Sequence, residues 1–111
     1  MNIERSEKGE VTIFALTGRL DANSAASVDR AFAAEIANGT RRVVWDFSGL
    51  TYISSAGLRS VLQALKQVAA NGGKLATCSL SRNVLEVFDI SGFKSLLTIC
   101  ADRASAVDAV A

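Results

Sequence analysis

The sequence predicts an α/β fold: a mixed, mostly parallel sheet of four to five strands with helices packed against it. After an opening pair of strands, segments with alternating or continuous apolar patterns take turns with segments whose apolar residues recur every three or four positions. This gives the order β-β-α-β-α-β-α-β-α, which is typical of sheets covered by helices. No proline-rich linker, internal repeat or low-complexity tract divides the 111 residues, so we expect a single domain over residues 1–111.

The first two strands are predicted at residues 2–7 and 10–17. The second, EVTIFALT, alternates residue by residue between its two sides, as strands do. The dipeptide KG before it predicts a hairpin turn. GRLDANS, which follows, is predicted to be a loop, with Asn23 or Ser24 as the N-cap of the next helix.

The first helix is expected to run to Ile36, with Asn38-Gly39 ending it. The next strand contains Val43–Trp45, a continuous run of β-favouring apolar residues, which predicts a central strand buried on both faces. A second helix is predicted over roughly residues 55–70, because its apolar residues recur at spacings of three and four. The tripeptide NGG ends that helix.

The last third of the chain repeats the alternation. KLATCSL (74–80) predicts a strand, and Ser81 is a suitable N-cap for a helix over residues 82–90. LLTIC (96–100) predicts a last short strand. A final short helix is expected to start near Asp102.

Composition argues against several classes of function. Twelve basic residues face eleven acidic ones without a basic run, so no nucleic-acid partner is expected. No apolar run reaches the roughly 18 residues of a membrane span. The start, MNIERSEKGE, lacks the apolar core of a signal peptide. We therefore expect a complete, cytoplasmic chain.

The chain has no histidine, which excludes serine–histidine and cysteine–histidine catalysis. Cys78 and Cys100 lie in short apolar runs and are expected to be small core side chains, not a disulfide or metal ligands. There is no phosphate-binding glycine motif, and the acid pair that a receiver domain needs beside an aspartate such as Asp46 is missing. We expect no catalytic residue, no metal and no cofactor.

The segment YISSAGLR (52–59) lies where the central strand gives way to the second helix. Serine is a favoured N-cap because its oxygen accepts a free backbone N–H, and Ser54 alone fulfils that role. Ser55 then begins the helix with its hydroxyl left over, at the positive helix end and four residues before Arg59, a setting that favours a phosphate. Gly57 costs helix stability and is expected to leave room for a partner. The residues alone leave two interpretations open: capping only, or a phosphorylation switch.

The central segment VVWDFSGLTYISSAGLRSVLQAL (43–65) resembles the signature of the STAS domain, and more narrowly that of the bacterial anti-sigma factor antagonists. TGRLDANSA (17–25) resembles the family's loop after the second strand, and SRNVLEVFDISGFKSLLTI (81–99) resembles its C-terminal helix–strand segment. The resemblance covers nearly the whole chain and implies a single STAS-like domain.

The resemblance implies a small regulatory protein with no enzymatic activity of its own. In this family, the unphosphorylated protein binds an anti-sigma factor that is also a serine kinase of the GHKL ATPase type, and this releases the sigma factor. The kinase phosphorylates one serine at the start of the helix after the central strand, which breaks the complex, and a PP2C-type phosphatase restores it. The serine in the matching position is Ser55, and Ser54 is the alternative acceptor.

The resemblance also implies a surface for the partner around this serine. The residues expected on it are Asp21, Asn23, Ser24, Ser54, Ser55, Gly57, Leu58 and Arg59. Ser54 stands where the family usually has an acid, and it can still cap the helix. Asp46 and Ser48 are expected to anchor the loop that leads into the helix.

Two function classes follow from the resemblance. The first is the phosphorylation-controlled antagonist, expected as a monomer or weak dimer. The second is a STAS adaptor subunit of a lipid-transport or stress-signalling complex, without a phosphorylation cycle. The hydroxyl-hydroxyl-Ala-Gly-Leu motif at residues 54–58 favours the first.

Overall fold

The computed structural model describes residues 1–111. Strands and helices follow one another in the predicted order, with one added 3₁₀ turn, η1, before the last strand. The elements are β1 (Asn2–Lys8), β2 (Val11–Leu20), α1 (Ala25–Ala37), β3 (Arg42–Ile53), α2 (Ser55–Ala70), β4 (Lys74–Cys78), α3 (Arg82–Ile90), η1 (Lys94–Leu96), β5 (Thr98–Cys100) and α4 (Arg103–Val110).

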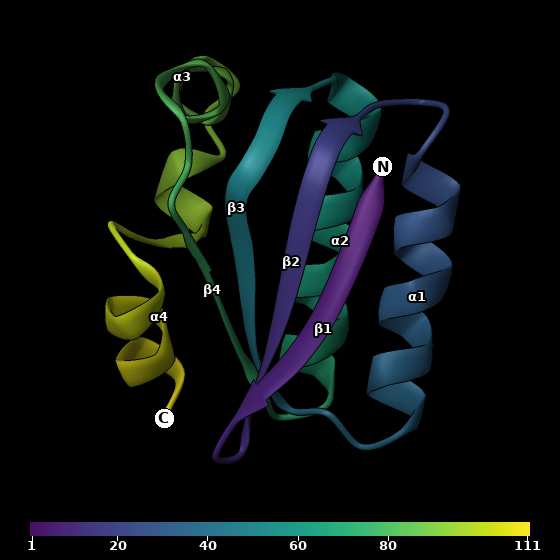
Figure 1. Ribbon diagram of the computed structural model, residues 1–111, viewed down its shortest axis with the longest axis vertical. Helices are drawn as coiled ribbons and strands as arrows, with labels where there is room; N and C mark the ends of the chain where they lie inside the picture. Colours follow the sequence, from purple (N-terminus) through teal and green to yellow (C-terminus); the bar gives the residue numbers. More distant parts are fainter.

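The strands form one sheet in the order β1-β2-β3-β4-β5. β1 pairs antiparallel with β2, and all other neighbours are parallel. α1, α2 and α3 cover one face over a cluster of 18 buried residues, and α4 covers part of the other face over a cluster of seven. Figure 1 shows α2 behind the sheet, α1 to the right of β1 and α4 beside β4. The predicted fold class is confirmed.

Two strands are longer than the sequence predicted. β2 continues to Leu20 and β3 to Ile53, so the first part of GRLDANS is strand, not loop. The β2–β3 register shifts between Ala15 and Thr17 and again at Gly18, where φ is +110°. These irregularities re-aim the strand, and both Leu20 and Ile53 remain in the core. As a result the carboxyl ends of β2 and β3 extend beyond the pairing with β4, next to the start of α2 (Figure 1).

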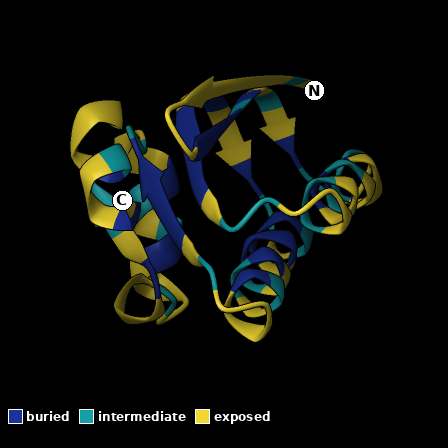
Figure 2. Cartoon of the chain, turned by 90° about the horizontal axis from the view of Figure 1, so that it is seen from below, coloured by how far each residue is buried: buried dark blue, intermediate teal, exposed yellow.

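The centre of the core is aromatic. The ring of Trp45 lies 5.5, 5.3 and 6.1 Å from those of Phe14, Phe32 and Phe47, measured between centroids. Val43 to Trp45 are fully buried, which confirms the prediction of a central strand covered on both faces. The indole N–H of Trp45 has no hydrogen-bond partner. Figure 2 shows that the strands covered by helices are buried, whereas β1, an edge strand, is mostly exposed.

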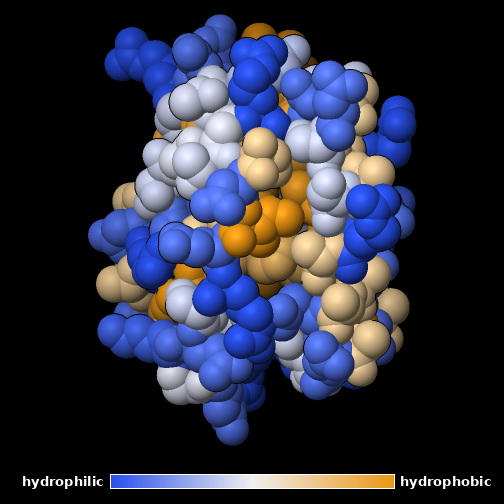
Figure 3. All heavy atoms as spheres, turned by 45° about the vertical axis from the view of Figure 1, so that its right-hand side comes forward, coloured by the Kyte–Doolittle hydropathy of each residue, from blue (hydrophilic) through white to orange (hydrophobic).

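The core approaches the surface between β1 and α1. Ile3, Ala31 and Ile36 are partly buried there and pack against the larger cluster. Figure 3, which brings the α1 side forward, shows a small apolar hollow surrounded by polar side chains. All the helices fall short of a membrane-spanning segment in length or apolar character.

Asp46 does not anchor a loop before α2, which corrects the prediction, because β3 continues through this position. Its carboxylate accepts the Ser48 N–H at 2.8 Å and the Nε–H and Nη2–H of Arg103 at 2.9 and 2.7 Å. Burial raises the pKa of this carboxyl, but the Ser48 N–H and Arg103 outweigh burial and hold it below its usual range. The pair therefore ties α4 to the sheet.

The two cysteines are 22 positions apart in the sequence but adjacent in the sheet, as register partners on β4 and β5. Both are free thiols; Cys78 is buried and Cys100 half-buried. Burial raises the pKa of the Cys78 thiol. The prediction of small core side chains is confirmed for Cys78.

Candidate functional site

The junction between β3 and α2 is built as a capped helix start. Ser54 has an extended backbone, with φ −97° and ψ 178°, and its Oγ accepts the Gly57 N–H at 3.3 Å. Ser55 is the first residue of α2. The predicted division between a capping serine and a first helical serine is confirmed.

The two serines differ in what holds them. Ser54 is half-buried, its hydroxyl is engaged by the cap, and its N–H donates to the Leu20 carbonyl at 2.9 Å. Ser55 is exposed, and its hydroxyl takes part in no hydrogen bond within the chain. Only Ser55 therefore presents a free hydroxyl to another molecule.

Gly57 does not leave room for a partner, which corrects the prediction. It is buried, and a Cβ at this position would stand 2.6 Å from the Leu20 carbonyl oxygen and 2.8 Å from Ile53 Cγ1. The backbone that approaches it closely is the end of β2. Leu58 is likewise buried, 5% exposed, and belongs to the core, so its side chain does not lie on the outer surface.

The loop after β2 is held by its own hydrogen bonds. Ser24 Oγ donates to the Arg19 carbonyl at 2.8 Å and accepts the Asp21 N–H at 3.0 Å. Asp21 Oδ1 accepts the Asn23 N–H at 3.0 Å. Ser24 occupies the N-cap position of α1, but its hydroxyl turns back to the loop and caps no helical N–H.

Contact between this loop and a partner remains a prediction. The position of the loop, next to the start of α2, agrees with that prediction. Asn23 is exposed and Asp21 half-exposed. The bond from the Ser54 N–H to the Leu20 carbonyl joins the base of the loop to the start of α2. The loop after β2, which contains Asp21 and Asn23, and the start of α2 at Ser55 therefore lie at one edge of the sheet, the carboxyl edge. Figure 1 shows both segments at the arrowheads of β2 and β3.

The electrostatic setting of Ser55 favours an added anion. The first turn of α2 contains no acidic residue, and its free N–H groups form the positive helix end. Arg59 is exposed, has no ion-pair partner in the chain and follows Ser55 by one helical turn. A phosphate on Ser55 meets favourable charge at this position.

Two residues at this edge were missed by the sequence reasoning. The Arg19 guanidinium carbon lies 4.1 Å from the centre of the Tyr52 ring, and Arg19 Nε lies 3.7 Å from Asp21 Oδ2. The two residues are register partners on β2 and β3. Tyr52 beside the inward-facing Ile53 was the available signal, since neighbours on a strand point to opposite faces.

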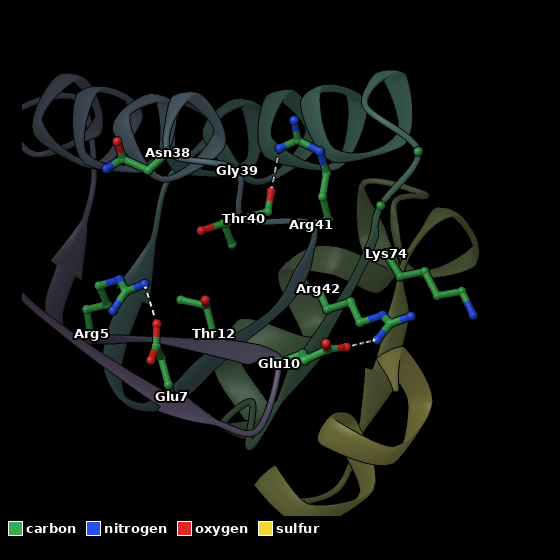
Figure 4. Close-up of a pocket in the computed structure, with 12 residues that line it drawn as sticks. Arg5, Glu7, Glu10, Thr12, Asn38, Gly39, Thr40, Arg41, Arg42 and Lys74 are labelled. Atoms are coloured by element: carbon green, nitrogen blue, oxygen red, sulfur yellow. Dashed lines mark hydrogen bonds and ion pairs between the residues drawn. The ribbon is translucent and has the colours of Figure 1, made fainter.

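A polar groove of about 540 Å³ lies at the opposite, amino edge of the parallel strands. Arg5 bonds to Glu7 at 2.9 Å and to Glu35 at 2.6 Å, and Arg42 bonds to Glu10 at 2.8 Å. Figure 4 shows the Arg5–Glu7 and Arg42–Glu10 pairs on two sides of the groove. Its charges are largely paired within the chain.

The STAS domain model matches residues 2–106. The chain belongs to the STAS domain family. BtrV of Bordetella bronchiseptica, provisionally named an anti-sigma factor antagonist, is 42% identical over 97 residues, which are 87% of this STAS chain and 84% of BtrV. The predicted family is therefore confirmed.

Solved structures share the fold of this STAS domain. A crystal structure from Thermotoga maritima, provisionally assigned as an anti-sigma factor antagonist, matches with a TM-score of 0.92 and 19% identity over 97% of this chain and 93% of the other. The phosphorylated form of the Bacillus cell fate determinant SpoIIAA matches with a TM-score of 0.75 and 22% identity over 99% of this chain and 100% of the other.

Proposed function

We propose that this STAS domain is an anti-sigma factor antagonist whose binding is switched off by phosphorylation of Ser55. The observation that carries the proposal is the exposed, unbonded hydroxyl of Ser55 at the first position of α2. The names of BtrV and of the structural neighbours support the antagonist role. The phosphorylated SpoIIAA structure supports a phosphorylation cycle for this fold.

The proposed mechanism is exclusion by charge. Unmodified Ser55 and the edge around it form a surface that a partner covers. A phosphate adds about −1.5 to −2 charge, which a partner packed against this edge has to bury. The free chain accommodates the same charge at the helix N-terminus beside Arg59. Phosphorylation therefore weakens the complex and leaves the fold intact.

The proposed partners are a GHKL-type serine kinase that is itself the anti-sigma factor, and a PP2C-type phosphatase that removes the phosphate. Both act in the cytoplasm in this proposal. Ser55 is favoured over Ser54 as the acceptor because the Ser54 hydroxyl is half-buried and holds the cap. The loop residues Asp21 and Asn23 are proposed as further contacts, since they lie around the same edge.

The test uses a GHKL-type kinase from the same genome, with ATP, and maps the modified residue by mass spectrometry. We expect one phosphate on Ser55 in the wild type and in Ser54→Asp, which keeps an N-cap, and none in Ser55→Ala. In a binding assay, Ser55→Ala is expected to bind the kinase as the wild type does.

Ser55→Glu is expected to lower the affinity at least about tenfold, with unchanged circular dichroism, because it places a charge in the interface. Equal binding by Ser55→Glu and Ser55→Ala contradicts charge exclusion. Absence of any kinase that binds the unmodified chain overturns the switch and favours a STAS adaptor without a phosphorylation cycle.

A further inference from the structure

Tyr52 is an exposed aromatic residue at the carboxyl edge. Its relative exposure is 41%, and the other large hydrophobic residues with exposed positions are Met1, Ile90 and Leu96. Tyr52 is close to the end of β3, three positions before Ser55. Its neighbour Ile53 points into the core, so Tyr52 points to the opposite face of the sheet.

Arg19 is held over this ring by a cation–π contact of 4.1 Å. Its side chain is 62% exposed, and its N–H groups form no hydrogen bond within the chain. The 3.7 Å contact to Asp21 is loose, with that carboxylate 25% exposed. The ring therefore fixes the position of a guanidinium whose donors remain available to another molecule.

The sheet face around this pair is open. α4 covers part of this face, where it packs on the smaller cluster. That cluster contains residues of the amino-terminal part of β2, of β3 and of β4. Farther along β2 and β3, Thr17, Ser48 and Thr51 are exposed. Figure 1 shows no helix over the ends of these two strands on the side away from α1 and α2. The pair borders this open face on one side and the start of α2 on the other.

We propose that Tyr52 and Arg19 are specificity-determining contacts for the kinase partner: Tyr52 is the aromatic anchor, and Arg19 binds a carboxylate of that kinase. The inference rests on the proposed function and extends its footprint from Ser55 onto the ends of β2 and β3. Tyrosine and arginine are enriched among the residues that dominate interface energies. An arginine already held on a ring loses less conformational freedom on binding, and it favours the planar geometry of a carboxylate.

The test measures kinase affinity for Tyr52→Ala, Arg19→Ala and Arg19→Lys, with Ile90→Ala as the matched control. Ile90 is 80% exposed and ends α3, a helix that supplies neither a residue of the Arg19–Tyr52 pair nor the start of α2. We expect Tyr52→Ala to lower the affinity about 30-fold and Arg19→Ala about tenfold, as for residues at the centre of an interface. Ile90→Ala is expected to stay within about twofold.

Arg19→Lys separates charge from geometry. Lysine keeps the charge but loses the planar stack, so we expect about a fivefold loss of affinity. Circular dichroism of every variant is expected to match the wild type, because both side chains are exposed. Tyr52→Leu keeps apolar area at this position. Its kinase affinity is measured instead if circular dichroism shows that Tyr52→Ala is less folded.

Wild-type affinity for both Tyr52→Ala and Arg19→Ala overturns this inference, and the phosphorylation switch stands as long as Ser55 is still modified. Equal losses in Ile90→Ala and Tyr52→Ala also overturn it, because the effect is then not local. No binding by the wild type overturns the proposed function, and this inference with it.

Discussion

The two ends of the parallel strands differ in whether their polar side chains are hydrogen-bonded within the chain. At the amino edge, Arg5 pairs with Glu7 and Glu35, and Arg42 pairs with Glu10, at 2.6 to 2.9 Å. At the carboxyl edge, the Ser55 hydroxyl and the Arg59 and Arg19 guanidiniums form no hydrogen bonds within the chain. Groups satisfied internally contribute little to recognition. The polar groove at the amino edge is therefore not the better candidate site. The better candidate is the carboxyl edge, where hydrogen-bond donors are available.

Helix α2 runs from one of these edges to the other, and a closely packed glycine lies near each of its ends. A Cβ on Gly57 meets the Leu20 carbonyl, and a Cβ on Gly73 meets the Arg41 carbonyl. Neither glycine requires a positive φ. The close approach of a backbone carbonyl, to the first turn of α2 at Gly57 and to the turn before β4 at Gly73, thus explains both residues.

The largest expected effect comes from filling these two positions. Gly57→Ala and Gly73→Ala are each expected to lower the free energy of unfolding by about 2–3 kcal/mol, because the added Cβ forces a hydrogen-bonded backbone carbonyl to shift. Urea unfolding followed by circular dichroism measures this. Only Gly57→Ala is expected to weaken kinase binding as well, since it displaces the loop after β2. Equal kinase affinity for the two variants contradicts the separation of the edges.

The Asp46–Arg103 pair lies between the two edges and gives the next largest effect. Arg103→Ala is expected to cost about 2 kcal/mol at pH 7, because the buried carboxylate loses two charge-assisted hydrogen bonds. The folded-state pKa of Asp46 is depressed, so its stabilisation is present above the unfolded pKa of about 3.9 and is lost as the pH falls through the folded pKa.

The difference in stability between wild type and Arg103→Ala is therefore expected to shrink below about pH 4. Urea midpoints at pH 7 and pH 3 measure it, with Asp46→Asn as the control that removes the titrating group. A difference that is the same at both pH values assigns the effect to packing of the Arg103 side chain. Kinase binding at pH 7 is expected to be unchanged.

The matched caps Ser54 and Ser81 give a smaller effect. Both accept an N–H at 3.3 Å, from Gly57 and from Val84. Ser54→Ala and Ser81→Ala are each expected to cost about 1 kcal/mol. Only Ser54→Ala is expected to slow phosphorylation of Ser55, because it loosens the turn that presents this residue. Slowing by both variants points to a general loss of stability.

The smallest effect is expected in the groove. Glu10 is 85% exposed where it pairs with Arg42, so Glu10→Gln is expected to change stability by less than about 0.5 kcal/mol. High salt is expected to remove that difference. A strong fall in kinase affinity for Glu10→Gln contradicts the assignment of the partner surface to the carboxyl edge.

The local features of the fold were predictable from the sequence. α2 spans Ser55–Ala70 as predicted, because its apolar spacing and the NGG stop are local signals. The caps Ser54, Ser81 and Asp102 were predictable for the same reason, and each accepts a helical N–H. The family followed from the segment over residues 43–65.

Features that depend on pairing between distant segments were not predictable. β2 and β3 run on to Leu20 and Ile53 because bulges let them continue, which no local pattern announces. The close neighbour of Gly57 is a carbonyl of another strand, so its role as a packing residue was taken for a partner contact. The stack of Arg19 on Tyr52 depends on the same register.

The single tryptophan has a practical consequence. Trp45 is fully buried among phenylalanines, and its indole nitrogen lacks a partner, so its fluorescence is expected to have the blue emission maximum of an apolar site. It lies on β3 several residues before the carboxyl edge. Its emission is thus expected to be insensitive to phosphorylation or docking there and to shift only on unfolding. Trp45 is therefore a native fluorescent reporter that distinguishes unfolding of the chain from a loss of phosphorylation or of partner binding.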